Sequence, residues 1–340
     1  MRSRIFIIYT GGTIGMIKDA ESGSLIPFDF DHLQEHIPEM KLLDCDITVH
    51  SFDPTIDSSN INLDIWVNLV ELIEDNYDHH DGFVILHGSD TMAFTASALS
   101  FMLEHLNKPV ILTGSQLPSG ISRTDATENL ITAIEIAAAQ ENEMPIVPEV
   151  CIYFEYQLYR GNRTTKVDSE NFKAFHSHNY PVLAEAGVHI KFNREFIQKI
   201  NNHKLTTHKQ LNPNIAVLKL FPGISKTVVE CILNIRDVEA IILETFGSGN
   251  SSTETWFTEA IKETINRGVL IINVTQCLGG AVELGRYQTS KTLKEVGVLS
   301  GFDSTTEAAI TKLMFLLSYE KDKIRLKKLI ESSLQGEVSV

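Results

Sequence analysis

Short apolar runs alternate with amphipathic stretches along almost the whole chain of 340 residues. Several of the apolar runs, such as Gly82–Leu86, are apolar along their whole length instead of at every second position, which is typical of strands buried on both faces of a parallel sheet. Between them, apolar residues recur at the helical spacing i, i+3, i+4, i+7, as in Trp66, Leu69, Val70 and Ile73. This alternation predicts an α/β fold built from β-α-β units.

The apolar runs predict strands at Arg4–Tyr9, Ile47–Phe52, Gly82–Leu86, Pro109–Leu112, Glu149–Phe154, Ile215–Leu220, Ala240–Leu243 and Gly268–Val274. The helical pattern predicts helices around Trp66–Ile73 and at Met92–His105, Asp125–Ala139, Thr227–Ile235 and Thr255–Arg267, with a charged surface helix at Tyr319–Leu334. The polar stretch 191–214 interrupts the pattern and indicates a connector. We therefore expect two α/β domains, 1–190 and 215–340, as is usual for a chain of this length.

The charge balance excludes some classes of partner. The formal net charge is −15, from 44 acidic and 29 basic side chains. Affinity for nucleic acids depends mainly on clustered Lys and Arg, so a nucleic-acid partner is not expected. No run of about 18 apolar residues is present, so no membrane span is expected. The apolar stretch Ile5–Tyr9 is shorter than the roughly 7–15 residues of a signal-peptide core and is better explained as a buried strand. These features favour a cytoplasmic enzyme.

Metal and redox motifs find no support in the sequence. The four cysteines lie far apart and form no CxxC pair. The twelve histidines are scattered, and the adjacent pair His79 and His80 lacks the spacing of an HExxH zinc motif. We therefore expect neither a metal nor another cofactor.

Hydroxyl-bearing residues gather where the N-terminal strands end, which is the place where ligand sites form in open α/β sheets. The segments after the first five strands are Thr10–Met16, Asp53–Ser59, His87–Thr91, Thr113–Gln116 and Tyr159–Lys166. Such a set suits acyl transfer, because a Thr or Ser hydroxyl attacks a carbonyl once a base takes its proton and backbone N–H groups stabilise the oxyanion. A lysine partly desolvated beside a serine and a carboxylate can be that base, since the pKa of a lysine falls on burial.

Each of these segments also has a structural interpretation when taken alone. Thr10–Met16 contains glycines like a phosphate loop, but it lacks both the GxGxxG order and the GxxxxGK[ST] spacing. His87–Thr91 is equally typical of a helix start with a Ser or Asp N-cap. Gly114–Pro118 fits an ordinary turn, and Arg160–Lys166 fits a solvated basic loop. Only their joint occurrence favours a catalytic site.

In these motifs the chain resembles the bacterial type I (cytoplasmic) L-asparaginases along nearly its full length. The most specific segments are Tyr9–Met16 (YTGGTIGM) and Asp81–Leu103, which contains HGSDT. The supporting segments are Asp57–Asn60, Lys108–Gln116, Leu158–Lys166, Pro222–Ser225, Gly247–Asn250 and Thr275–Cys277. The resemblance implies a flavodoxin-like larger N-terminal domain with a parallel sheet, a smaller α/β C-terminal domain, and assembly into dimers or tetramers.

The resemblance also implies the hydrolysis of L-asparagine to L-aspartate and ammonia through a threonine nucleophile and an acyl-enzyme, without a cofactor. Thr13 matches the nucleophile. Ser89, Asp90 and Lys166 match the second catalytic group, in which Lys166 would be the proton-accepting partner of the hydroxyl. Asp90 would also bind the α-ammonium group of the substrate.

Further positions are implied to bind the substrate. They are Gly12, Asp57, Ser58, Gly88, Ser115, Gln116 and Asn250. Ser58 and nearby backbone N–H groups would hold the α-carboxylate. Asn250 would complete the site from a neighbouring subunit.

Three features depart from the family pattern. Ser89 replaces the usual threonine and lacks the methyl group that restricts χ1. The loop Lys18–Pro27 has no tyrosine, although many members use one there to help activate the nucleophile. Activation then depends on Ser89 and Lys166 or on another group. Glu244 stands where some type I enzymes have an arginine that binds an allosteric asparagine, and an anion there should abolish that recognition.

Two other functions remain open at this point. In the first, the chain has kept the pocket but lost the chemistry and is a non-catalytic amino-acid-binding sensor. Within the catalytic reading, it also stays open whether Ser89 or Thr13 is merely a binding group. In the second, the chain is the asparaginase-like subunit of a tRNA-dependent amidotransferase. That reading needs an additional N-terminal domain and a partner that handles tRNA, and it fits poorly with an acidic chain that begins at its first strand. Ammonia release from asparagine discriminates between the catalytic and sensor readings.

Overall fold

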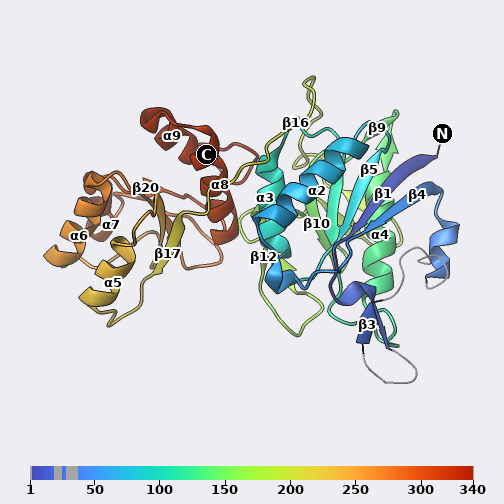
Figure 1. Cartoon of the computed structure of the whole chain (residues 1–340), viewed down its shortest axis with the longest axis horizontal. Helices are drawn as coiled ribbons and strands as arrows, with labels where there is room; N and C mark the ends of the chain where they lie inside the picture. The colour runs from blue at the N-terminus through green and yellow to red at the C-terminus, as the bar shows by residue number, and fades with distance from the viewer. Residues whose placement is uncertain (1, 19–24, 28–36, 340) are drawn as a thin grey trace. The chain divides into compact units, whose positions relative to one another are not determined.

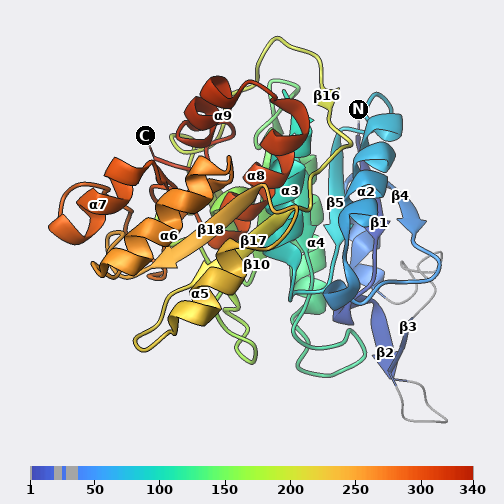
Figure 2. The same cartoon turned by 60° about the vertical axis from the view of Figure 1, so that its left-hand side comes forward.

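The computed structural model describes residues 2–18, 25–27 and 37–339. Contacts divide the chain into two compact units, Met1–Lys209 and Gln210–Val340. The division falls within the expected connector, whose bounds, 191–214, stay a prediction. Figure 1 and Figure 2 show each unit as a sheet with helices packed on its faces. None of the helices in this described part of the chain has the length and apolar character needed to span a bilayer.

The first unit is built on an eight-stranded sheet that begins with five parallel strands. In chain order these are β1 (Ser3–Tyr9), β4 (Cys45–Ser51), β5 (Gly82–Leu86), β7 (Val110–Thr113) and β10 (Val150–Phe154). Their order in the sheet is β4-β1-β5-β7-β10, which is the 2-1-3-4-5 order of flavodoxin-like folds. The expected fold class is therefore confirmed, and the switch point of the sheet lies between β1 and β5.

Three antiparallel strands extend this sheet beyond β10. They are β11 (Gln157–Arg160), β14 (Ala184–Ala186) and β15 (Ile190–Phe192). The chain reverses between β10 and β11 through a two-residue turn in which Glu155 and Tyr156 have φ of 43° and 64°. A turn this short can join only antiparallel neighbours. The sheet is therefore mostly parallel, with an antiparallel extension that the sequence did not indicate.

Helices cover both faces of the sheet. On one face, α4 (Ala126–Ala138) packs against Ile5, Ile7 and Val84 in a single hydrophobic core. On the other face lie α2 (Leu63–Asn76) and α3 (Met92–Met102), as Figure 1 shows. Ten of the eleven residues of α3 are buried, which explains why apolar residues surround this helix instead of forming one stripe.

The edge strand β4 differs from the fully buried strand expected at Ile47–Phe52. Its residues alternate between half-buried and exposed, because a strand at the edge is covered less completely than its neighbours. The helix expected at Met92–His105 is also shorter than predicted and ends at Met102. His105 itself has φ of 62°, a value that cannot continue a right-handed helix.

Short pairings complete the first unit. They join β2 (Met16–Lys18) to β3 (Leu25–Pro27), β6 (Leu103–Glu104) to β16 (Thr206–Thr207), β8 (Gln140–Glu141) to β9 (Met144–Pro145), and β12 (Thr165–Lys166) to β13 (Phe175–His176). Short 3-10 turns occupy Thr13–Gly15, Pro38–Leu42, Ser58–Asn60 and Gly161–Arg163. Thr13–Gly15 follows β1 and Ser58–Asn60 follows β4, so these two turns shape the carboxyl edge of the sheet, at which the predicted site residues lie.

The second unit is a smaller α/β domain around a parallel sheet, as expected. The sheet order is β17 (Ile215–Lys219), β18 (Ala240–Thr245), β19 (Leu270–Thr275) and β20 (Leu299–Ser300). One face packs against α5 (Lys226–Leu233), α6 (Thr255–Asn266) and α7 (Gln288–Val296). The other packs against α8 (Thr306–Tyr319) and α9 (Lys323–Ile330).

The charged helix expected at Tyr319–Leu334 is present but shorter, as α9 (Lys323–Ile330). Helix α8 ends at Tyr319, and a new helix, α9, begins after Asp322. The Asp322 carboxylate accepts hydrogen bonds from the backbone N–H of Ile324 (2.8 Å) and Arg325 (3.0 Å), which caps the start of α9. This helix buries Leu326 and Ile330 in the domain core. Its charged residues occupy one face only.

A buried ion pair joins Glu149, the residue before β10, to Arg160 in β11. Arg160 Nε lies 2.6 Å from Glu149 Oε2, and the two side chains are 7% and 3% exposed. Arg160 Nη2 also donates to the carbonyl of Phe196 (2.9 Å), and Glu149 Oε1 accepts from the N–H of Gln198 (2.7 Å). The pair therefore fastens the segment 196–198 to the strand that leads toward Lys166.

We predict that Arg160→Met destabilises the first unit by roughly 3–5 kcal/mol, because it leaves the Glu149 carboxylate buried without its cation. Urea unfolding measures the loss. Arg194→Met is the matched control, since Arg194 pairs with Glu141 across 3.5 Å at side chains 47% and 65% exposed. It should cost less than about 1 kcal/mol. Equal losses in the two variants would contradict the prediction.

Candidate active site

Glycines bring the loops after β1, β4 and β5 into direct contact. Gly12, after β1, has φ of 91°, and a Cβ there would lie 2.6 Å from the backbone nitrogen of Gly88, after β5. A Cβ on Gly88 would lie 2.5 Å from Ser58 Oγ, after β4. Only glycine fits at these two positions. Three of the predicted strand-end segments therefore meet beside the switch point, where ligand sites form in such folds.

The side chains of Ser89, Asp90 and Lys166 form a hydrogen-bonded cluster. Lys166 Nζ donates to Ser89 Oγ at 2.8 Å and to Asp90 Oδ1 at 2.7 Å. The Lys166 side chain is 16% exposed, and that of Asp90 is 68% exposed. An ion pair with one partner in solvent adds little stability, so the main effect of these contacts is to place three polar groups together. The structure thus brings together three of the four predicted catalytic residues.

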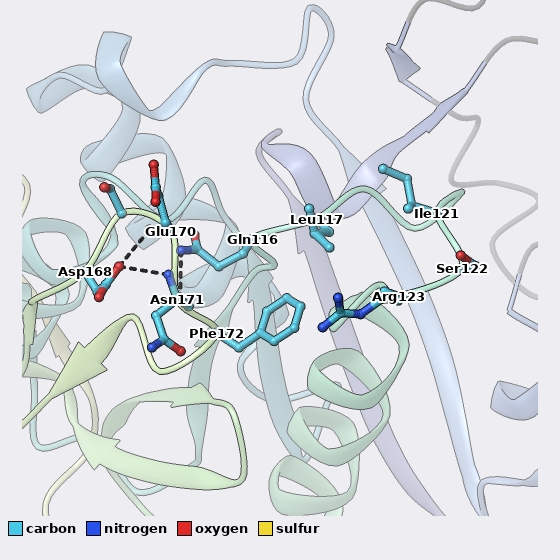
Figure 3. A pocket seen from close by; sticks show the side chains of 10 residues that line it. Gln116, Leu117, Ile121, Ser122, Arg123, Asp168, Glu170, Asn171 and Phe172 are labelled. Carbon is cyan, nitrogen blue, oxygen red and sulfur yellow. Dashed lines mark hydrogen bonds between the residues drawn. The ribbon is translucent and has the colours of Figure 1, made fainter.

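Gln116, in the loop after β7, extends this cluster. Ser89 Oγ donates to Gln116 Oε1 at 3.3 Å, and Gln116 Nε2 donates to the carbonyl of Asn171 at 3.0 Å. Figure 3 shows Gln116 on the wall of a cleft of about 900 Å³. The other residues lining the cleft come from two loops, 117–123 and 168–172. The Gln116 side chain therefore belongs both to the wall of this cleft and to the Ser89 cluster.

Two of the predicted binding residues are engaged within their own loops. Asp57 caps the turn Ser58–Asn60 and accepts a hydrogen bond from the N–H of Ser59 at 2.9 Å. Hydrogen bonds from the Ser59 side chain and backbone lower the pKa of Asp57. Ser115 is buried, and its Oγ donates to the carbonyl of Leu117 at 2.7 Å. Both side chains shape the loops that surround the site.

The predicted nucleophile, Thr13, begins a short turn directly after Gly12. Tyr9 lies 1% exposed beneath this turn, and its hydroxyl donates to the carbonyl of Gly12 at 3.5 Å. Burial raises the pKa of Tyr9 to about 12, so its hydroxyl stays protonated and supports the turn. The loop Lys18–Pro27, which lacks the family's tyrosine, falls largely on residues 19–24, outside the described residues.

His87 has a structural role that the sequence did not reveal. It is fully buried, and its Nδ1 contacts the carbonyl of Gly88 at 2.7 Å. Because a carbonyl only accepts, Nδ1 carries the proton and Nε2 accepts from Thr95 Oγ1 at 2.9 Å. Thr95 Oγ1 in turn accepts from Trp66 Nε1 at 2.9 Å. This chain fixes the peptide that precedes Ser89. The only sequence signal was the His in HGSDT.

Asn250 belongs to the second unit. Its Oδ1 accepts from Thr289 Oγ1 at 2.6 Å, and its backbone forms a bridge with Phe246. These contacts hold the GSGN segment in a tight turn. The expectation that Asn250 completes the site of a neighbouring subunit stays a prediction.

Within residues 2–18, 25–27 and 37–339, no group of three His, Cys, Asp or Glu residues is arranged to hold a metal ion. The expectation of a reaction without a metal stays a prediction.

Comparison with known protein families assigns the fold and the site to a class. Residues 4–198 match the family model for the asparaginase N-terminal domain, and residues 214–330 match the glutaminase/asparaginase C-terminal domain. A doubly wound first domain with this cluster, followed by a smaller α/β domain, defines an enzyme of the asparaginase and glutaminase class. Within that class, the chain belongs to the asparaginase family.

Individual relatives agree with this assignment. The chain is 43% identical to L-asparaginase 1 of Escherichia coli (strain K12) over 346 aligned residues, which cover 99% of this chain and 98% of that protein. The solved structure of L-asparaginase I from Vibrio cholerae matches with a TM-score of 0.90 and 39% identity over the whole of both chains. The L-asparaginase of Thermococcus kodakarensis matches with a TM-score of 0.90 and 32% identity over 99% of each chain. The resemblance expected from the sequence is confirmed.

We predict that His87 makes the fold sensitive to mild acid. Burial lowers the pKa of His87 from 6.5 to about 4. Between these values the unfolded chain binds a proton that the folded chain does not, so the free energy of unfolding falls as pH falls, by up to about 3 kcal/mol. His87→Gln should flatten this part of the pH profile in urea unfolding. The exposed His79, changed to Gln, should leave the profile as in the wild type. An unchanged slope in His87→Gln would contradict the prediction.

Proposed function

We propose that this chain hydrolyses L-asparagine to L-aspartate and ammonia. The observation that carries the proposal is the position of Lys166 Nζ, within hydrogen-bond distance of both Ser89 Oγ and Asp90 Oδ1 beside the switch point of the sheet. A hydroxyl, an amine and a carboxylate in contact can move a proton and bind an amino-acid zwitterion at one place. Membership of the asparaginase family and the full-length similarity to enzymes named L-asparaginase support the same conclusion.

In the proposed mechanism, Thr13 Oγ attacks the side-chain amide carbon of asparagine and forms an ester. The proton of the hydroxyl passes through the Ser89 and Lys166 pair, and the amide nitrogen takes up a proton as the C–N bond breaks and ammonia leaves. Water then attacks the ester, which releases aspartate and restores the Thr13 hydroxyl. Backbone N–H groups of the glycine-rich loops stabilise the oxyanion in both steps.

The charges of the site suit the two ends of the substrate. Asp90 offers two acceptor oxygens, so it can bind the α-ammonium group while Lys166 donates to Oδ1. The Asp90 side chain is 68% exposed and therefore accessible to a ligand. Ser58 Oγ, beside Gly88, is the proposed donor to the α-carboxylate. An anionic acceptor at one end of the pocket and a hydrogen-bond donor at the other would hold the side-chain amide toward the nucleophile.

The assembly and the location of the protein are proposed on the family resemblance. We propose that the chain associates with itself as a dimer or tetramer in the cytoplasm and that Asn250 of one subunit completes the site of another. Size-exclusion chromatography with light scattering measures the assembly. A monomer that turns over asparagine at full rate would contradict a role for Asn250 across subunits.

We predict that Thr13→Ala lowers ammonia release from L-asparagine by at least about a thousandfold, because it removes the attacking oxygen. The free energy of unfolding should change by less than about 1 kcal/mol, since the hydroxyl is not a packing group. Thr13→Ser is the matched control and should retain measurable turnover. An active Thr13→Ala enzyme would exclude Thr13 as the nucleophile. Wild-type protein that is stabilised by asparagine but releases no ammonia would instead be a sensor.

We also predict that velocity rises hyperbolically, without a sigmoidal phase, as the asparagine concentration increases. Glu244 is 8% exposed, accepts from Thr306 Oγ1 at 2.9 Å and pairs with Lys219 Nζ at 3.2 Å. A carboxylate held in this way repels the carboxylate of an effector. Initial rates across a wide range of asparagine concentrations test this, with Glu244→Arg as the comparison. A sigmoidal wild-type curve would contradict the prediction.

A further inference from the structure

The Ser89 hydroxyl lies between two hydrogen-bond partners. Lys166 Nζ donates to Ser89 Oγ at 2.8 Å, and Ser89 Oγ donates to Gln116 Oε1 at 3.3 Å. Because Lys166 Nζ is the donor in the first of these contacts, the proton of the serine hydroxyl must point elsewhere. Gln116 Oε1 is the acceptor that receives it. The hydroxyl is thus held from both sides.

The Gln116 side chain is itself held in one orientation. Its Nε2 donates to the carbonyl of Asn171 at 3.0 Å, as the dashed line in Figure 3 shows. A carbonyl only accepts, so this contact decides which end of the amide is nitrogen and turns Oε1 toward Ser89. The Gln116 backbone N–H also donates to the Asp125 carboxylate at 2.9 Å. Both ends of the residue are therefore fixed.

The segment whose Asn171 carbonyl binds the Gln116 side chain also contains Lys166. The Asp168 carboxylate accepts from the N–H of Glu170 and of Asn171, each at 2.8 Å, and so shapes the turn that presents the Asn171 carbonyl (Figure 3). Asp168 is two positions from Lys166 along the chain. One segment therefore supplies the amine on one side of Ser89 and the carbonyl that orients the amide on the other side.

The hydrogen bond to the oriented Gln116 amide restricts χ1 of Ser89, whose own side chain has no methyl group to do so. A threonine side chain is restricted at χ1 by its methyl group, whereas a serine turns freely among three rotamers. We propose that Gln116 is a positioning residue that holds the Ser89 hydroxyl in the rotamer facing Lys166, in place of that methyl group. The proposal rests on the proposed function, and it differs from the substrate contact that the sequence suggested for Gln116.

The test compares four enzymes: wild type, Gln116→Met, Ser89→Thr and the double variant. Methionine keeps the length of the side chain but removes both hydrogen bonds. In the serine background, Gln116→Met should lower kcat about fivefold to tenfold, the size expected for one neutral hydrogen bond, with little change in KM. In the threonine background the same change should cost less than about twofold, because the β-branched side chain keeps its own rotamer.

Other results would overturn the proposal. Equal losses of kcat in the two backgrounds would mean that Gln116 acts independently of the Ser89 rotamer, and a raised KM with unchanged kcat would mean that it binds substrate. Gln140→Met, on the exposed strand β8, is the control and should behave as wild type. Absence of wild-type activity would contradict the proposed function itself, whereas an active wild type with additive losses contradicts only the role of Gln116.

A structural readout tests the same proposal without activity. A high-resolution crystal structure of Gln116→Met should show the Ser89 hydroxyl in more than one rotamer. The double variant with Ser89→Thr should show a single rotamer with the oxygen toward Lys166. A single, unchanged Ser89 rotamer in Gln116→Met would overturn the proposal.

Discussion

The hydrogen bonds from Lys166 to Ser89 and Asp90 are the constraint on which the candidate site depends. They join the loop after β5 to β12, across 76 positions of the sequence. To keep both bonds, the two segments must hold their separation within about half an ångström, the width of the hydrogen-bond distance range. The sheet supplies this precision, because β11 returns antiparallel from β10 and is fastened by the buried pair of Glu149 and Arg160.

The sequence predicted those elements whose residues are all buried and form one continuous apolar run. The expected strand Gly82–Leu86 has the observed bounds of β5, because all five of its residues are buried and its apolar run is continuous. The strand β11 was missed because the turn before it, Glu155 and Tyr156, contains none of the Gly, Asn or Asp residues that indicate a hairpin. Helix α7, Gln288–Val296, was missed because its residues are mostly polar and it packs in the core through Leu293.

The candidate site also has features that the sequence predicts and contacts that it does not. That Ser89, Asp90 and Lys166 lie close together could be predicted, because their positions after strands and their family motifs are properties of the local sequence. The contacts of His87 and Gln116 could not, since the direction of a hydrogen bond depends on which partner the fold brings near. Nothing in the sequence pairs Gln116 with the carbonyl of Asn171, which lies 55 positions away.

The two residues whose contacts the sequence did not reveal share one physical principle. His87 faces the carbonyl of Gly88, and Gln116 donates to the carbonyl of Asn171. Each side chain has one donor end and one acceptor end, and a carbonyl only accepts, so the backbone decides which end faces the next hydroxyl. The orientation of that hydroxyl then follows from the fold and not from rotamer preference. This is why a serine can occupy position 89: the restriction that a β-branched side chain carries in itself is supplied by a neighbour that the backbone holds.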